Sequence, residues 1–259
     1  MSTQNLTNRV VLVTRPQHQA DKLAQLIETA GGKALLFPSI EIQSLRDNPH
    51  VQQTFAQINQ YDMLIFTSAN AVMQAQQILQ SMARSPESIE AQIAVIGKAT
   101  QAAAQQAGFQ VSIQPETGFN SEALLAQPQM QLVSNHRILL VRGQSGLEVL
   151  AENLRERGAI VDYAEVYCRA VPVTDTGLQR HQLSQHWVDY GISDIIVTSN
   201  ESLQNLYDML EMPARQAMLK VHLVVPSKRC VTLAHSLGFE RITQAESALN
   251  QHMINALFE

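Results

Sequence analysis

Short motifs recur in this sequence about half its length apart. The spacing between matched motifs stays nearly constant, from 127 residues (Arg15 to Arg142) to 131 residues (Thr67 to Thr198). The matched stretches are residues 11–15 and 139–143, 30–32 and 157–159, 62–68 and 194–199, and 93–97 and 222–226. Agreement at so many places along the chain is not expected by chance. It indicates an internal duplication, and two copies of one unit predict two similar lobes with a cleft between them.

Each copy alternates short apolar runs with longer amphipathic segments. The apolar runs are nearly continuous, which is typical of strands covered on both faces in a parallel sheet. Strands are expected at residues 10–13, 34–37, 63–66, 93–96 and 111–113, and in the second copy at 138–141, 160–163, 194–197, 222–225 and 241–243. Strands that alternate with helices predict an α/β protein with right-handed crossovers.

Composition argues against several classes of protein. The chain of 259 residues is 45% hydrophobic, enough for two cores, and its net charge of −5 argues against nucleic-acid binding. Cys168 and Cys230 have no metal-ligand spacing, which favours a reduced, cytoplasmic protein. The N-terminus is polar and no apolar run is long enough to span a bilayer, so no membrane association is expected.

Polar turns follow the predicted strands, at the edge where parallel sheets bind their ligands. Each turn opens a helix, whose N-terminus offers free N–H groups and a positive dipole end. For one turn alone, helix capping is the simpler interpretation. As a set, with their lysines and arginines, the turns favour an anion that carries many carboxylates or phosphates. The candidate binding residues are Thr14, Arg15, Thr67, Ser68, Gly97, Lys98, Thr100, Arg142, Gly143, Thr198, Ser199, Ser227 and Arg229.

Familiar catalytic and cofactor motifs are missing from the sequence. It contains no G-x-G-x-x-G, no P-loop, no H-E-x-x-H and no G-x-S-x-G motif. The histidines have no metal-ligand spacing either. We therefore expect neither a metal nor a cofactor.

The order of several weak motifs resembles the uroporphyrinogen-III synthase family across essentially the whole chain. The motifs are LVTRP at residues 12–16, FTSANAV at 66–72, GKAT at 97–100, ETGFNSEAL at 116–124, LVRG at 140–143 and EVY at 165–167. The resemblance implies two flavodoxin-like parallel-sheet domains from an internal duplication, joined by a two-stranded linker. It also implies that the first β-α-β segment of each copy packs with the remainder of the other copy.

The resemblance then sets the expected domain boundaries. Domain one would be discontinuous, made of residues 1–38 and 172–259, and domain two would be residues 42–166. The linkers would be residues 38–42 and 166–172. The family further implies a cytoplasmic monomer without a cofactor, which receives its substrate by possible handover from the preceding pathway enzyme.

The reaction implied by the resemblance is cyclisation of hydroxymethylbilane, a linear tetrapyrrole, with loss of water and inversion of the last pyrrole ring. Tyr167 matches the family tyrosine that assists departure of hydroxide, and Thr100 matches a family threonine that contacts the substrate. Arg229 departs from the pattern, since it stands where some relatives carry a threonine. The substrate carries many carboxylates, which suits the predicted set of helix N-termini.

Two other functions stay open at the level of sequence. One is a non-catalytic, two-lobed binding protein for an anionic small molecule, which two α/β lobes would also suit. The other is a nucleotide-sugar transferase, which the lack of an acidic metal site and of a glycine-rich phosphate loop disfavours.

Overall fold

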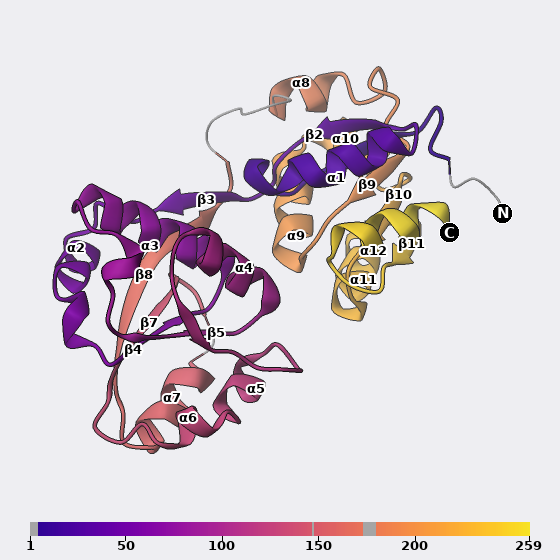
Figure 1. The fold of residues 1–259 in the computed structure, drawn as a ribbon. Helices are drawn as coiled ribbons and strands as arrows, with labels where there is room; N and C mark the ends of the chain where they lie inside the picture. The colour runs from indigo at the N-terminus through magenta and orange to yellow at the C-terminus, as the bar shows by residue number, and fades with distance from the viewer. Residues whose placement is uncertain (1–4, 147, 173–179) are drawn as a thin grey trace. The chain divides into compact units, whose positions relative to one another are not determined.

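The computed structural model describes residues 5–146, 148–172 and 180–259, and the chain divides into two compact units. Unit 1 comprises Met1–Glu41 and Ala170–Glu259, and unit 2 comprises Ile42–Arg169 (Figure 1). Each unit holds one sheet. No described helix is both long and apolar enough to cross a membrane.

Unit 1 is built on a five-stranded sheet whose neighbouring strands all pair in parallel. The spatial order is β11-β10-β9-β1-β2. The strands are β1 (Val10–Val13), β2 (Lys33–Leu36), β9 (Asp194–Ile196), β10 (His222–Val225) and β11 (Arg241–Gln244). The helices are α1 (Gln17–Thr29), α8 (Arg180–Gln185), α9 (Asn200–Met209), α10 (Met212–Met218), α11 (Lys228–Leu237), α12 (Asn250–Asn255) and the 3-10 turn η3 (Ala256–Phe258).

Helices cover both faces of the unit 1 sheet. Alternate residues of β1 point to opposite faces, so Val11 and Val13 pack with α1 and α12, whereas Leu12 packs with α8, α9, α10 and α11. A strand buried on both faces must be apolar at successive positions. This is why the nearly continuous apolar runs correctly predicted a parallel α/β arrangement.

Unit 2 is built on a six-stranded sheet in the order β3-β8-β7-β4-β5-β6. The pairs from β8 through to β6 are parallel. The strands are β3 (Glu41–Ser44), β4 (Met63–Phe66), β5 (Gln92–Val95), β6 (Val111–Ile113), β7 (Arg137–Gly143) and β8 (Ile160–Ala170). The helices are α2 (Pro49–Ala56), α3 (Ala69–Ser81), α4 (Lys98–Gln106), α5 (Ser121–Leu125), α6 (Pro128–Gln131) and α7 (Val149–Glu156), with 3-10 turns η1 (Ile58–Gln60) and η2 (Pro86–Ser88).

The unit 2 sheet is also sandwiched between two helical layers. Figure 1 shows α2, α3 and α4 on one side and α5, α6 and α7 on the other. Two buried clusters match these layers: one joins Phe55, Ile78 and Ala104 to the sheet, and the other joins Leu124 and Leu154. The expected α/β class is therefore correct, with two sheets that are dominated by parallel pairing.

Strand β8 is much longer than the sequence indicated. The apolar run predicted a strand at residues 160–163, but the strand continues to Ala170 and includes Tyr167, which pairs with Gly143. The extension is mixed in polarity and escapes an apolar-run criterion. A strand that reaches this far brings the segment expected to be a linker into the sheet of unit 2 as far as Arg169.

Candidate functional site

A cavity of about 220 Å3 lies at the carboxyl ends of β4 and β7 in unit 2. Ligands of parallel sheets bind at this edge. Five residues named from the sequence line the cavity together: Thr67, Ser68, Arg142, Gly143 and Tyr167. Its other lining residues are Ile96, Ser121, Leu140, Ser145, Gly146, Leu150 and Arg169. Most of the unit 2 residues predicted from strand-end turns therefore meet in one place.

Tyr167 reaches this cavity because of an irregularity in the pairing of β8 with β7. Arg142 pairs with Glu165, but the next residue, Gly143, pairs with Tyr167, so Val166 is an extra residue in β8. Such a bulge re-aims the side chains of its strand. Val166 and Tyr167 consequently pack in the same buried cluster, although neighbours in a regular strand point to opposite faces.

Gly143 makes room for the ring of Tyr167. A β-carbon at residue 143 would lie 2.7 Å from Cζ and 3.0 Å from the hydroxyl oxygen of Tyr167. Tyr167 is only 4% exposed, so the ring has little freedom to move away. Gly143 therefore acts through shape, by the absence of a side chain.

Ser68 contacts the functional end of Tyr167. The two hydroxyl oxygens are 3.1 Å apart, and the Ser68 oxygen also accepts the Ala71 N–H at 3.1 Å as the N-cap of α3. The adjacent Thr67 places its hydroxyl 3.5 Å from the carbonyl of Val141, a long contact. The N-cap holds Ser68 in position, so the tyrosine hydroxyl is anchored to the start of a helix.

Arg142 is paired with two carboxylates at the wall of the cavity. Its guanidinium lies 2.9 Å from Glu148 and 3.1 Å from Glu165, and stacks over Tyr163 at 4.2 Å. Burial alone would lower the pKa of Arg142, but hydrogen bonds and charge from Glu148 and Glu165 raise it overall. Glu148 and Glu165 therefore already compensate much of the positive charge of Arg142. Binding of an anionic ligand by Arg142 stays a prediction.

The turn before α4 carries three more predicted residues of unit 2. Gly97 is the N-cap of α4, Lys98 is the first residue of the helix, and the Thr100 side chain is buried. The Lys98 ammonium stacks over the ring of Phe119, 4.9 Å from its centroid. None of the three lines the cavity described above. Their role in binding stays a prediction.

In the first turn of unit 1, both candidate side chains make hydrogen bonds within the unit. Thr14 is fully buried, and its hydroxyl lies 2.9 Å from the Ile196 carbonyl and 2.8 Å from the Ser202 hydroxyl. Arg15 donates to the carbonyl of Ala248, and burial lowers its pKa. The Thr14 hydroxyl therefore makes its hydrogen bonds inside unit 1, and ligand binding at this turn would depend on Arg15 or on the backbone.

The other two turns of unit 1 are helix caps. Ser199 accepts the Ser202 N–H at 3.0 Å at the start of α9, and Ser227 accepts the Cys230 N–H at 3.4 Å at the start of α11. Thr198 lies beside the first cap and is half-buried, and Arg229 is exposed within α11. The capping interpretation is thus correct for these serines, and anion binding by these turns stays a prediction.

Three polar residues of the cavity, Ser121, Ser145 and Arg169, were missed by the sequence analysis as binding candidates. Arg169 is exposed and stands two residues after Tyr167, so the period of a strand places both side chains on one face. Ser121 begins α5 within the ETGFNSEAL motif. The spacing to Tyr167 would have identified Arg169 if β8 had been expected to extend beyond residue 163.

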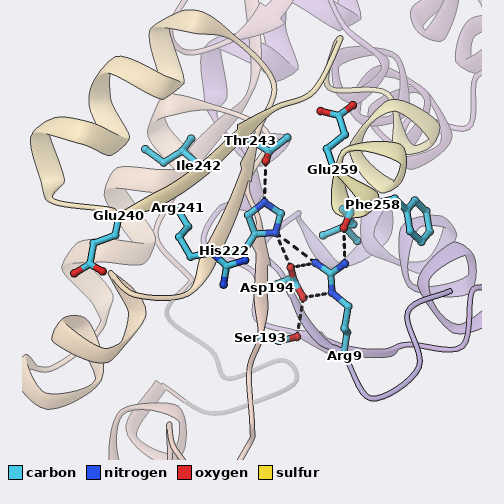
Figure 2. Close-up of a pocket in the computed structure, with 11 residues that line it drawn as sticks. Arg9, Ser193, Asp194, His222, Glu240, Arg241, Ile242, Thr243, Phe258 and Glu259 are labelled. Carbon is cyan, nitrogen blue, oxygen red and sulfur yellow. Dashed lines mark hydrogen bonds and ion pairs between the residues drawn. The ribbon is translucent and has the colours of Figure 1, made fainter. Parts of the chain in front are cut away.

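A second cavity, of about 690 Å3, lies at the amino ends of the unit 1 strands, the edge opposite to the predicted turns. Figure 2 shows the side chains of Arg9, Ser193, Asp194, His222 and Thr243 directed at one another. The fully buried Asp194 accepts from Arg9 Nε at 2.8 Å and Ser193 Oγ at 2.7 Å, and lies 2.8 Å from His222 Nδ1. Since Arg9 also donates to the Leu257 carbonyl, this network ties the chain end to the sheet.

The described part of the chain contains no candidate cluster of metal-binding side chains. No three His, Cys, Asp or Glu side chains there are placed to hold an ion. The polar side chains that line the Tyr167 cavity are hydroxyl groups and the guanidinium groups of Arg142 and Arg169.

The two parallel-dominated sheets, with a polar cavity at the carboxyl ends of one of them, define a two-unit α/β protein of the type that binds small molecules. Comparison with known families narrows this class. Residues 21–255 match the family described as uroporphyrinogen-III synthase HemD. The chain belongs to the uroporphyrinogen-III synthase family.

Relatives support this assignment over nearly the full length. The uroporphyrinogen-III synthase of Escherichia coli K12 is 31% identical over 95% of this chain and 99% of its own. That of Salmonella typhimurium LT2 shows the same identity and coverage. The crystal structure of uroporphyrinogen-III synthetase from Helicobacter pylori 26695 superposes with a TM-score of 0.59 at 15% identity, covering 96% of this chain and 98% of that one. This structural likeness supports the fold.

Proposed function

We propose that this protein is a uroporphyrinogen-III synthase that cyclises hydroxymethylbilane, with loss of water and inversion of the last pyrrole ring. The observation that carries the proposal is the Tyr167 hydroxyl in the wall of a polar cavity, in a chain that matches this family over residues 21–255. The alternative of a non-catalytic binding protein is not favoured, because relatives that match this chain over nearly its full length are named as synthases.

Tyr167 would act as the general acid. The substrate loses its terminal hydroxyl group as water, with the electron pair of the adjacent ring nitrogen driving departure and the phenol supplying the proton. A tyrosine is normally protonated at neutral pH and can donate. Because the ring nitrogen already provides the driving force, modest acid assistance is sufficient.

Ring inversion follows from the resulting azafulvene cation. The last ring attacks it through its already substituted carbon, and the spirocyclic intermediate then fragments and closes again through the other carbon. A proton leaves the ring carbon in the final step and restores the phenol, so the overall change is loss of one water. The protein favours inversion over head-to-tail closure by holding the chain, and a tenfold preference requires only about 1.4 kcal/mol.

Substrate carboxylates would be bound by the helix N-termini that follow the strands. Ser68, Ser199 and Ser227 each occupy the N-cap of such a helix. Charge-assisted hydrogen bonds contribute roughly 1.5–3 kcal/mol each. Arg169 adds an exposed cation beside Tyr167 at the cavity.

We also infer that the two units descend from one duplicated unit, with domains at residues 1–38 plus 172–259 and 42–166. The support is the strand order: β2-β1-β9-β10-β11 in unit 1 corresponds to β8-β7-β4-β5-β6 in unit 2. Each sheet thus combines strands from both copies: β1 and β2 with β9, β10 and β11 in unit 1, and β4, β5 and β6 with β7 and β8 in unit 2. A two-stranded linker at residues 38–42 and 166–172, a cytoplasmic monomer and handover from the preceding enzyme stay predictions, and residues 173–179 lie outside the described structure.

The product isomer tests the proposed function directly. Freshly generated hydroxymethylbilane is mixed with the protein, and the products are oxidised and separated. We expect isomer III to dominate, whereas the enzyme-free control gives the uninverted isomer I. A product no richer in isomer III than the control would overturn the proposal.

A further inference from the structure

We propose that Ser68 is a positioning residue for Tyr167: its hydroxyl donates a hydrogen bond to the Tyr167 oxygen, which leaves the phenol proton directed into the cavity. This inference rests on the proposed function, because it explains how the tyrosine presents its proton to the substrate. It changes the role expected for Ser68, from a residue that binds the substrate to one that acts through Tyr167.

An account of donors and acceptors supports this direction. A serine hydroxyl has one proton and two acceptor positions. The Ala71 N–H occupies one acceptor position of Ser68 at 3.1 Å, and the Tyr167 oxygen lies at 3.1 Å. If Ser68 donates to Tyr167, the Ser68 proton is engaged in this hydrogen bond. The phenol proton of Tyr167 then remains available to a ligand in the cavity. If Tyr167 donated to Ser68, its proton would be engaged inside the protein.

The same arrangement stabilises the negative charge that forms on the Tyr167 oxygen as its proton moves to the substrate. Ala71 N–H, Ser68 O–H and Tyr167 O–H form a chain in which each hydrogen bond polarises the next. When the phenol loses its proton, the bond from Ser68 becomes charge-assisted and the N-terminus of the 13-residue helix α3 faces the new negative charge. The stabilisation therefore grows as the proton moves, which is what catalysis requires.

Rigid anchors fix both partners of this contact. Ser68 is held by its cap on α3, and Tyr167 is held by the β8 bulge and by a backbone hydrogen bond from Gln144 N–H to the Tyr167 carbonyl at 2.8 Å. Ser199 and Ser227 cap their helices in the same way. Ser68 differs from these two serines because its hydroxyl also contacts the hydroxyl of a tyrosine.

A double-mutant cycle tests the inference. Ser68→Ala is made in the wild-type and in the Tyr167→Phe background, and kcat and KM are measured on hydroxymethylbilane. We expect Ser68→Ala to lower kcat by at least about tenfold with KM nearly unchanged, and Ser68→Thr to retain activity. In the Tyr167→Phe background, Ser68→Ala should have no further effect on kcat. An unchanged kcat in Ser68→Ala, or equal losses in both backgrounds, would overturn the inference.

Loss of the helix cap is controlled separately. Asn48→Ala removes the N-cap bond of α2, in which His50 N–H donates to Asn48 Oδ1 at 2.9 Å, in the same unit and away from the cavity. Its kcat should equal that of the wild type. If Ser68→Ala does not fold, Ser68→Gly removes the hydroxyl while keeping a residue that N-caps tolerate well.

Infrared spectroscopy tests the hydrogen bond without any substrate. With tyrosine labelled by 13C at the hydroxyl-bearing carbon, the difference between wild type and Tyr167→Phe isolates the C–O stretch of Tyr167. We expect the band of a phenol that accepts a hydrogen bond, and a shifted band in Ser68→Ala. The band of a phenol that only donates, and accepts no hydrogen bond, overturns the inference whatever the activity. A wild-type protein that forms no isomer III overturns the proposed function instead.

Discussion

The ring of Tyr167 lies across Gly143 so closely that a β-carbon on residue 143 would be 2.7 Å from Cζ of the ring. The two residues are paired on adjacent strands, directly after the bulge that adds Val166 to β8. The bulge turns the tyrosine towards Gly143, and the glycine leaves the space that the ring fills. Bulge and glycine together set the position of the candidate catalytic hydroxyl.

Gly143→Ala should therefore lower turnover by about tenfold or more, because the new methyl group displaces the buried ring. We expect a loss of stability of about 1–3 kcal/mol from overpacking. Turnover is measured by formation of isomer III and stability by urea denaturation. Full activity in Gly143→Ala would show that the position of the ring does not matter.

Tyr167→Phe should lower kcat by roughly 100-fold, since general acid catalysis commonly contributes a factor of this size. The protein should remain folded, because the substitution removes one hydroxyl and leaves the ring in its cluster. Losing the bond to Ser68 should cost only about 1 kcal/mol of stability. Near-normal turnover by a folded Tyr167→Phe variant would remove Tyr167 from the acid role.

Glu148→Gln should lower KM for the anionic substrate about threefold, because it removes one of the two carboxylates that compensate Arg142. The gain should shrink at high ionic strength, which screens exposed charges. Glu152→Gln is the matched control: it removes an equal charge from α7 at an exposed position. If both variants change KM equally, the change in KM comes from the net charge of the protein and not from the loss of the Glu148 carboxylate beside Arg142.

The buried Asp194 should make unit 1 sensitive to acid. Burial on its own would raise the pKa of Asp194, but hydrogen bonds from His222, Arg9 and Ser193 lower it from 3.8 to about 2. The unfolded state therefore binds a proton at a higher pH than the folded state does. The stabilisation is complete above pH 3.8 and is lost as the pH falls towards 2.

The difference in pKa corresponds to roughly 2 kcal/mol. We expect the free energy of unfolding, measured in urea at a series of pH values, to fall by about this amount between pH 4 and pH 2 relative to Asp194→Asn. The variant should be less stable than the wild type at pH 7. Parallel curves for the two proteins would contradict the prediction.

Much of the fold could be predicted because parallel strands carry a strong local signal. Val11 and Leu12 face opposite helical layers, so both must be apolar, and this doubly buried character is visible in the sequence. The extension of β8 to Ala170 could not be predicted in this way. Its residues are held by pairing with β7 and β3, and pairing depends on segments distant in the sequence.

The candidate site was predictable in part, for the same reason. The carboxyl ends of the strands and the turns after them follow directly from the positions of the strands, so Thr67, Ser68, Arg142 and Gly143 could be named. The burial and the hydrogen-bond partner of each of these residues could not be predicted. A threonine that faces the core, as Thr14 does, and a serine that contacts a tyrosine look alike in a sequence, because burial and partner are set by the other strands.

The sequence by itself determined the α/β class, the repeated motifs and the set of helix-opening turns, since each depends on residues close together in the chain. Tertiary structure decided which of those turns meet at one cavity, that Arg142 is shared by Glu148 and Glu165, and that a bulge opposite Gly143 delivers Tyr167 to Ser68. These features depend on the register between β7 and β8. Register is a relation between two segments, and neither segment specifies it alone.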